Sequence, residues 1–551
     1  MAAWVRPAMR VSGGPDRHMA APELTFLFRK AAVYDGTGAT PVVADVGVAG
    51  DRIAFLGGAE EARAHEILDC EGLTLAPGFI DIHSHSDHVL LAAPHAESKV
   101  LQGVTTEVGG NCGSSPGPMV DAVRAEAELD LAEFGMEVTW QTLGEFFDLL
   151  ETGGIALNFA CLVGHNNLRA AAMGYEQRPA WQDEIRAMRG LVAQAMREGA
   201  VGVSSGLVYQ PGAAADAAEL GEVCRPAAQM GGFYATHMRD EGAQLLESMQ
   251  EALEVGKRSG CAVQISHHKA SGEANWGLVE HSLALLDFAR AAGMDATADQ
   301  YPYTATSTGL HVLLPEWVQE GGAEQAARRL ADEGIRRRAA AELELRPRED
   351  WEHIRIAQVS TDEHRWAEGL TVTELARRLE MNEAQAVIEL IVRERGHVAL
   401  VRFAMSEQDV ERVMRHPAVM VGSDAGARAT TGPLARGKPH PRCFGAFPRV
   451  LGHYVRERRV IGLGEAIRKM TRLPARRLGL EDRGVLRRGA HADLVLFDSE
   501  RIADRATYED PIQPPVGIKG VWVNGRIVAR DGELTGALAG RVLRGPGFAR
   551  A

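Results

Sequence analysis

The sequence has few cysteines and no long apolar run, and both shortages narrow the class of protein. Its six cysteines are scattered, with no CxxC pair, so a disulfide framework is not expected and a reducing compartment is favoured. No stretch reaches the roughly 18 consecutive apolar residues of a transmembrane helix, and the N-terminal segment has no apolar core typical of a signal peptide. We therefore expect a cytoplasmic protein with no membrane partner.

Positive charge is in the minority in this chain of 551 residues. Its 60 Lys and Arg residues are outnumbered by 74 Asp and Glu residues, which gives a formal net charge of -14. Such a charge repels nucleic acid, and no basic stripe typical of a nucleic-acid-binding module is present. The composition favours a globular protein that acts on a small molecule, and it is compatible with an oligomer.

The two ends of the chain have the same pattern of apolar and polar residues. Residues 23–75 and 485–551 hold short segments of alternating apolar residues broken by Gly and Asp, which is typical of β-strands. Asn524 and Gly525 suit a hairpin turn, because both tolerate a positive φ. We predict one small β-domain built from both ends, and a disordered extension over residues 1–22.

Residues 76–484 alternate strand and helix patterns. The strand-like segments are PGFIDIHSH, VTTEVGGNC, LNFACLVGH, GAVGVSSGL, GGFYATHMR, AVQISHHK, DATADQYPY and AVMVGSDAG. Eight such units predict an α/β fold, a (β/α)8 TIM-like barrel. The gap before the last strand is far longer than a usual loop, and amphipathic segments at about 310–415 lie in it. We predict a helical insertion there and interpret it as a lid.

Polar residues follow several of these strands, at the edge where barrel active sites lie. His83 and His85 are two residues apart, so both side chains face the same way on a strand. His237, His267 and Asp424 each end a later apolar segment. Imidazole and carboxylate groups are good zinc ligands, so the pattern predicts a metal centre rather than unrelated core or surface histidines.

Cys112 follows the second strand, in NCG. A thiolate at this position would bind zinc well, but a free cysteine is also a common buried core residue. The residues alone leave these two interpretations open.

Several motifs together resemble those of the amidohydrolase superfamily, and within it those of the N-acyl-D-amino-acid deacylases (D-aminoacylases). They are APGFIDIHSHSD, QGVTTEVGGNCG, VGHNNLR, THMRDEG, ISHHK, DQYPYTATST, GSDAG and KPHPRCFG, spread from about Leu24 to Val542. The resemblance implies zinc-dependent hydrolysis of the amide bond of N-acyl-D-amino acids, which releases a carboxylate and a free D-amino acid. Many amidohydrolases bridge two metals with a carboxylated lysine on the fourth strand, which GAVGVSSGLVY lacks.

The resemblance also implies a set of metal ligands. Cys112, His237 and His267 would form one tight zinc site. His83, His85 and Asp424 would form a second, weak or partly occupied site, bridged by Cys112. Asp424 would take a proton from the attacking water, whose pKa zinc lowers to about 7, and return it to the departing amine. The alternative is that Asp424 only binds metal.

For the substrate, the resemblance implies that Lys269, Tyr301 and Arg442 hold the α-carboxylate. Without it, each has a plainer interpretation as a solvated charge or a core tyrosine. Relatives that take acidic D-amino acids carry an arginine in the segment TATSTGLHVLLPEWV, which has none here, so a neutral, hydrophobic side chain is expected. The alternatives are a cyclic amide or imide, an N-acyl acidic D-amino acid, and a non-catalytic assembly protein.

Three further polar residues are expected to have structural roles. His165 would make hydrogen bonds near the site, and His268 would point away from it. Arg239 would pair with its neighbour Asp240 or Glu241.

Overall fold

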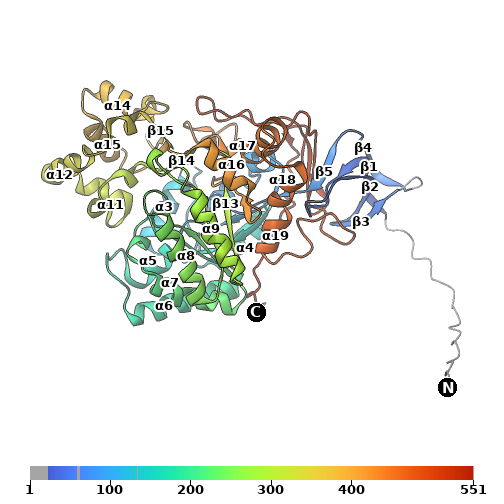
Figure 1. Cartoon of the computed structure of the whole chain (residues 1–551), viewed down its shortest axis with the longest axis horizontal. Helices are drawn as coiled ribbons and strands as arrows, with labels where there is room; N and C mark the ends of the chain where they lie inside the picture. The colour runs from blue at the N-terminus through green and yellow to red at the C-terminus, as the bar shows by residue number, and fades with distance from the viewer. Residues whose placement is uncertain (1–22, 59–61, 133, 550–551) are drawn as a thin grey trace, which may run out of the picture.

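The computed structural model describes residues 23–58, 62–132 and 134–549, so the predicted extension over residues 1–22 lies outside the described residues. Three parts follow one another along the long axis of the molecule (Figure 1). The strands near the N-terminus lie at one end, the helices of the insertion lie at the other, and the barrel lies between them.

Eight parallel strands form the barrel. They are β6 (Phe79–Asp81), β7 (Val104–Gly109), β8 with β9 (Asn158–Cys161 and Val163–Gly164), β10 (Gly202–Gly206), β11 (Phe233–His237), β12 (Ala262–Ile265), β13 (Ala296–Gln300) and β17 (Val419–Val421). A parallel bridge between Ser84 and Ala425 closes the ring, and the Asp424 N–H donates to the His83 carbonyl at 2.8 Å. The predicted (β/α)8 barrel is confirmed.

Helices cover the outside of the ring because each has one apolar face. They include α4 (Leu143–Gly153), α5 (His165–Met173), α6 (Gln182–Glu198), α7 (Ala217–Gln229), α8 (Leu245–Ser259), α9 (Val279–Ala291), α16 (Glu407–Arg415), α18 (Leu463–Met470) and α19 (Arg472–Arg477). In α6, Ile185, Met188 and Val192 are buried at helical spacing. Gly199 ends that helix with a φ of 117°, a left-handed conformation that glycine adopts without strain.

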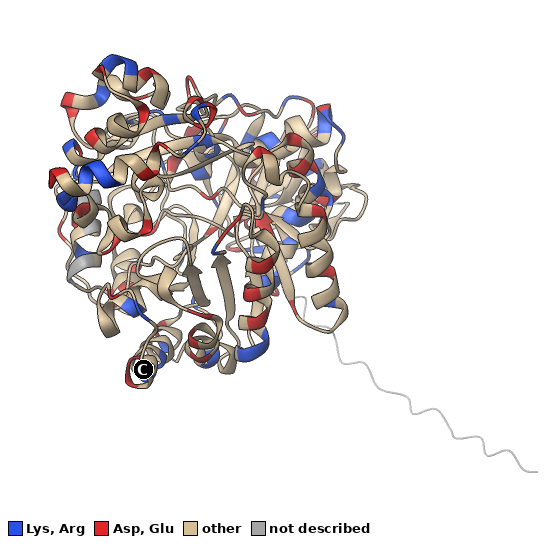
Figure 2. Cartoon of the chain, turned by 60° about the vertical axis from the view of Figure 1, so that its left-hand side comes forward, with Lys and Arg blue, Asp and Glu red and all other residues tan. Residues whose placement is uncertain are grey.

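Further helices lie on the loops of the barrel. They are α1 (Val89–Ala92), α2 (Glu97–Val100), α3 (Asp121–Ala132) and α17 (Arg442–Arg449), which continues into a π-helix at Val450–Glu457. No helix in the described part of the chain is long and apolar enough to cross a membrane. Figure 2 shows acidic and basic residues interspersed over the outer helices and the insertion.

One nine-stranded sheet joins strands from both chain ends. It contains β1 (Leu24–Val33), β2 (Val42–Ala49), β3 (Arg52–Gly57), β4 (Ala64–Asp69) and β5 (Thr74–Pro77), together with β18 (Leu494–Phe497), β19 (Ile518–Val523), β20 (Arg526–Arg530) and β21 (Glu533–Leu534). The two halves meet where β5 pairs antiparallel with β18. Asn524 and Gly525, with φ angles of 48° and 76°, make the turn between β19 and β20.

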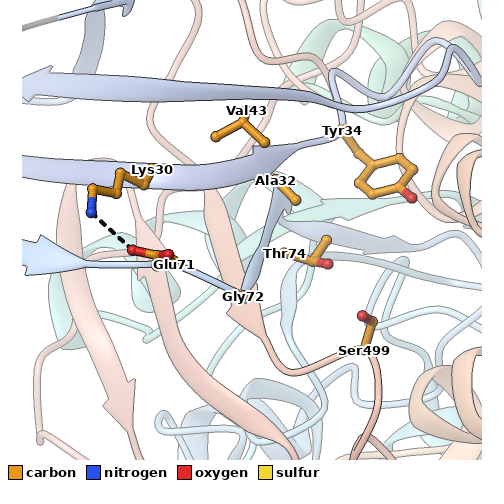
Figure 3. Close-up of a pocket in the computed structure, with 8 residues that line it drawn as sticks. All are labelled: Lys30, Ala32, Tyr34, Val43, Glu71, Gly72, Thr74 and Ser499. Atoms are coloured by element: carbon orange, nitrogen blue, oxygen red, sulfur yellow. Dashed lines mark hydrogen bonds and ion pairs between the residues drawn. The ribbon is translucent and has the colours of Figure 1, made fainter.

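A pocket lies on this sheet (Figure 3). The charged groups that line it are Lys30 and Glu71, which form an ion pair at 2.8 Å and are both largely exposed. A solvent-exposed ion pair of this kind contributes little stability. The residues that line the pocket include no histidine or cysteine. The pocket therefore has no set of side chains suited to catalysis or metal binding, and the candidate site lies at the barrel rim instead.

The insertion is not wholly helical. Its helices are α10 (Glu316–Gln319), α11 (Gly322–Arg329), α12 (Glu333–Leu343), α13 (Arg348–Glu352), α14 (Val372–Leu379) and α15 (Glu383–Arg393), and they pack around a core of their own. They accompany an antiparallel sheet of β14 (Ala305–Gly309), β16 (Val398–Phe403) and β15 (Ile354–Val359). The Gly272 N–H and the Trp276 indole both donate to the Ala404 carbonyl, which fastens the base of the insertion to the barrel.

A buried lysine ties three barrel strands together beneath the rim. The Lys99 ammonium, which is fully buried, donates to Asp81 Oδ2 at 2.8 Å, Ser423 Oγ at 2.7 Å and the Ala425 carbonyl at 2.6 Å. Glu107 Oε2 lies 3.6 Å away. Because Asp81 ends β6, Glu107 belongs to β7 and Ser423 follows β17, one cation links the strand ends that carry several candidate ligands.

Removing this cation should destabilise the fold. Lys99→Met leaves the buried Asp81 and Glu107 carboxylates without their cation, so we expect the free energy of unfolding to fall by about 3–5 kcal/mol. Urea denaturation of full-length protein measures the change. Lys257→Met on the outer face of α8 is the matched control, since that lysine is largely exposed and should leave the midpoint unchanged. Equal midpoints for the two variants would contradict the role of Lys99.

Candidate metal centre

Six side chains gather at the carboxyl ends of the barrel strands. They are His83 and His85 after β6, Cys112 after β7, His237 at the end of β11, His267 after β12 and Asp424 after β17. Cys112, His267 and Asp424 have positive φ angles of 52°, 34° and 52°, a conformation that non-glycine residues rarely adopt. Such backbone strain clusters at functional sites, where the surrounding structure holds a side chain in place.

The donor atoms of these side chains lie close together. Cys112 Sγ is 3.4 Å from His83 Nε2 and 3.5 Å from His267 Nε2, and the latter is 2.9 Å from His237 Nδ1. Four residues, His83, Cys112, His267 and Asp424, each offer one ligand atom, and these atoms all lie within 4.8 Å of one another. The structure therefore brings together all the residues that the sequence nominated as ligands.

Asp424 links the candidate ligand histidines His83 and His85 to Arg442. Its Oδ1 lies 3.0 Å from His85 Nε2 and 3.4 Å from His83 Nε2, while its Oδ2 accepts from Arg442 at 2.7 Å. Burial alone would raise the pKa of the carboxyl, but the positive charges of Arg442, His267 and His83 hold it well below its usual range. The Asp424 side chain is therefore ionised at neutral pH.

Cys112 has a similar electrostatic environment. Burial raises the pKa of its thiol, but His83 and His267 lower it more, and the net pKa lies well below the ordinary value. A thiolate, imidazole nitrogens and a carboxylate in one buried cluster match the ligand preferences of zinc. The donor set fits this metal.

Two carboxylates that the sequence did not reveal as part of the site each contact the second ring nitrogen of a candidate ligand histidine. Asp299 Oδ1 lies 3.0 Å from His83 Nδ1, and Glu241 Oε1 lies 2.8 Å from His267 Nδ1. A ligand histidine usually donates its second ring N–H to such a carboxylate, which fixes the ring and its tautomer. Both acids stand in motifs beside strand ends, DQYPY and THMRDEG, and that position was the available signal.

The predicted substrate residues also meet here. The Arg442 guanidinium lies 4.6 Å from the centre of the Tyr301 ring, and Lys269 Nζ lies 5.8 Å from it. Lys269 is bonded to Glu241 Oε1 at 2.5 Å. The Tyr301 hydroxyl points instead to Met405 Sδ at 3.7 Å, so the ring face, rather than the hydroxyl, lies toward the two cations.

Three other polar residues lie outside the cluster. His165 Nε2 is 3.1 Å from Glu219 Oε1, and His268 Nε2 is 2.8 Å from Ser282 Oγ on α9. The prediction for Arg239 was wrong, because its guanidinium pairs with Glu251 on α8 at 2.9 Å and donates to two carbonyls. Helix α8 turns back over the loop, so a residue twelve positions away is nearer than the adjacent acids.

A (β/α)8 barrel with histidine, cysteine and carboxylate donors at the carboxyl ends of its strands is typical of a metal-dependent enzyme. The sequence profile of the amidohydrolase family matches residues 66–529. The D-aminoacylase of Alcaligenes xylosoxydans xylosoxydans is 39% identical over 517 residues, which cover 94% of this chain and 97% of that protein. The chain belongs to the amidohydrolase family, and the resemblance of the sequence motifs is confirmed.

Two solved structures match with a TM-score of 0.80 and 36% identity, and each match covers 95% of this chain and 100% of the other. One is a D-aminoacylase with a binuclear metal centre, in which one metal activates the enzyme and the second attenuates it. The other is the N-acyl-D-glutamate deacylase of Bordetella bronchiseptica, complexed with zinc and a phosphonate that mimics the tetrahedral intermediate.

Proposed function

We propose that this protein is a zinc-dependent N-acyl-D-amino-acid deacylase that prefers neutral, hydrophobic side chains. The observation that carries the proposal is the Cys112 thiol within 3.5 Å of His267 Nε2, at a rim where β10 has no lysine. A cysteine at that place, beside two cations for a carboxylate, is the feature expected of this branch of the family. The similarity to D-aminoacylase over nearly the whole chain supports the same reaction.

The ligands divide into two groups in this proposal. Cys112, His237 and His267 would hold the tight zinc, and His83, His85 and Asp424 would hold a second, weaker metal with Cys112 shared between them. When bound, zinc supplies a Lewis acid that polarises the amide carbonyl and lowers the pKa of water. A thiolate in place of the carboxylated lysine needs no added modification to be anionic in this environment.

Asp424 is the proposed general base and acid. Its carboxyl is ionised and faces the cluster of donor atoms through Oδ1, so it is placed to take the proton of an attacking water. The same carboxyl then returns that proton to the amide nitrogen as the C–N bond breaks. Arg442 holds Oδ2 and so fixes the plane of the carboxyl group.

Lys269 and Arg442 are the proposed partners of the substrate α-carboxylate. Both cations lie over the face of the Tyr301 ring, so one aromatic side chain positions the two of them. His311, in the segment expected to face the substrate side chain, is partly buried, and the loss of solvent around its ring lowers its pKa to about 4. It is therefore neutral at pH 7 and gives no positive charge to an acidic side chain, which supports a neutral substrate.

The zinc-loaded protein should release leucine from N-acetyl-D-leucine, with kcat/KM at least about 100-fold above that for N-acetyl-L-leucine or N-acetyl-D-glutamate. The amine released is quantified for each compound, with a cyclic imide tested alongside. Faster turnover of the D-glutamate derivative would contradict the side-chain preference. Turnover of the imide alone, or of nothing by fully zinc-loaded protein, would contradict the deacylase assignment.

The cytoplasm is the compartment we propose for this enzyme. All six cysteines are free and buried, which suits a reducing environment.

A further inference from the structure

A lysine and a glutamate compete for one nitrogen of a proposed zinc ligand. Lys269 Nζ lies 2.8 Å from His267 Nδ1, and Glu241 Oε1 lies 2.8 Å from the same nitrogen. Lys269 and Glu241 are also bonded to each other at 2.5 Å, and all three side chains are largely buried. An ammonium can only donate a hydrogen bond, and an ionised carboxylate can only accept one.

The proton on the His267 ring therefore depends on which neighbour prevails. If His267 Nδ1 donates to Glu241, its Nε2 keeps a free lone pair, and this atom faces Cys112 Sγ and His237 Nδ1. If Lys269 donates to Nδ1 instead, the neutral ring carries its proton on Nε2. That tautomer directs an N–H at the position where the metal would bind.

The loop that carries Glu241 is held firmly, so its carboxylate is a built feature of the site. Asp240 Oδ1 accepts from the N–H groups of Gly242 at 2.7 Å and Gln244 at 2.9 Å. The Ser271 N–H donates to the Glu241 carbonyl at 2.7 Å, which joins this loop to the one after β12. Both loops therefore keep Glu241 between Lys269 and His267.

We propose that Glu241 is a positioning residue that selects the metal-binding tautomer of His267 against the competing donor Lys269. The inference rests on the proposed function, because it takes His267 as a zinc ligand and Lys269 as a substrate cation. It accounts for a lysine needed for the substrate carboxylate standing next to a ligand histidine without disabling it. Glu241 accepts from both groups, so Nδ1 keeps its proton and the lysine donates to the carboxylate rather than to the ring.

The test is a double-mutant cycle on zinc affinity, measured by competition with a chromophoric chelator on the full-length protein. Glu241→Gln should weaken zinc binding by about 10- to 100-fold, the usual effect of losing such a carboxylate. Lys269→Met alone should change the affinity by less than about threefold. The double variant should bind zinc as tightly as Lys269→Met does, because the competing donor is gone.

A charge effect and a direct metal bond would each give a different result in this cycle. If Lys269 acted only through its charge, Lys269→Met would tighten zinc binding by the same factor in both backgrounds, and such additivity would overturn the proposal. A direct metal–Glu241 bond would leave the double variant as weak as Glu241→Gln, which would also overturn it. Glu251→Gln, the same change on the neighbouring Arg239 pair, is the control and should leave zinc affinity unaltered.

Failure of the wider proposal is recognised separately. A wild-type protein that binds no zinc, or that binds zinc and hydrolyses no N-acyl-D-amino acid, would overturn the proposed function itself. Tight zinc binding and deacylation that are insensitive to Glu241→Gln would overturn only the role of Glu241. If Glu241→Gln alone fails to fold, the double variant is compared with Lys269→Met, and a tenfold gap in zinc affinity overturns the inference.

Discussion

Asp424→Asn should lower kcat by about 10²- to 10⁴-fold, the usual contribution of a positioned general base. Asparagine keeps the size of the side chain but cannot take a proton, and it removes the negative charge that faces His83 and His85. It also leaves the buried Arg442 guanidinium without its carboxylate partner. Steady-state kinetics with N-acetyl-D-leucine at saturating zinc measures the effect.

Asp409→Asn is the matched control for this variant. Asp409 is buried on α16 and accepts from the Gly277 N–H at 2.8 Å, a bond that an asparagine oxygen can also accept. Its kcat should stay within about twofold of wild type, since it lies outside the metal cluster. Near-normal kcat for Asp424→Asn would remove Asp424 from proton transfer and leave it as a metal ligand only. A rise in KM with constant kcat would point to a role in substrate binding.

The barrel could be predicted from sequence because its information is local. Several strands are apolar segments followed by polar residues, and helices such as α6 show an apolar face at regular spacing. The sheet in the insertion could not be predicted in this way. Its strand Ala305–Gly309 reads ATSTG, with little apolar alternation, and it pairs with residues about ninety positions later in the chain. Pairing at that separation leaves no local pattern.

The candidate site likewise has residues that the sequence could predict and residues that it could not. The histidine and aspartate ligands stand at strand ends, where the fold itself brings them together, so their types and positions were enough to nominate them. Cys112 was nominated only through the resemblance of its motif to a known family, because a free cysteine is also a common core residue. The groups that hold them were not accessible to this reasoning. Glu241 looked like a partner for Arg239, whereas the structure places Glu251 there and turns Glu241 toward His267. Which acid meets which base depends on the path of two loops.

Cys112→Ser should weaken zinc binding by more than about 100-fold, beyond the effect expected for any supporting residue, and hydrolysis should be lost with the metal. Serine is nearly isosteric and can adopt the same backbone conformation, but its hydroxyl stays neutral where a zinc-bound thiol would be deprotonated. Zinc affinity is measured by chelator competition, and bound metal by elemental analysis.

Cys261→Ser separates the ligand role from the general loss of a buried thiol. Cys261 is also buried, but its Sγ contacts only the Cys224 carbonyl at 3.5 Å among the described hydrogen bonds, which a serine hydroxyl can replace. Its zinc affinity should equal that of wild type. If Cys112→Ser also kept full zinc affinity, the histidines and Asp424 would suffice to hold the metal. The cysteine would then be a packing residue, and the deacylase assignment would rest on the similarity to D-aminoacylase alone.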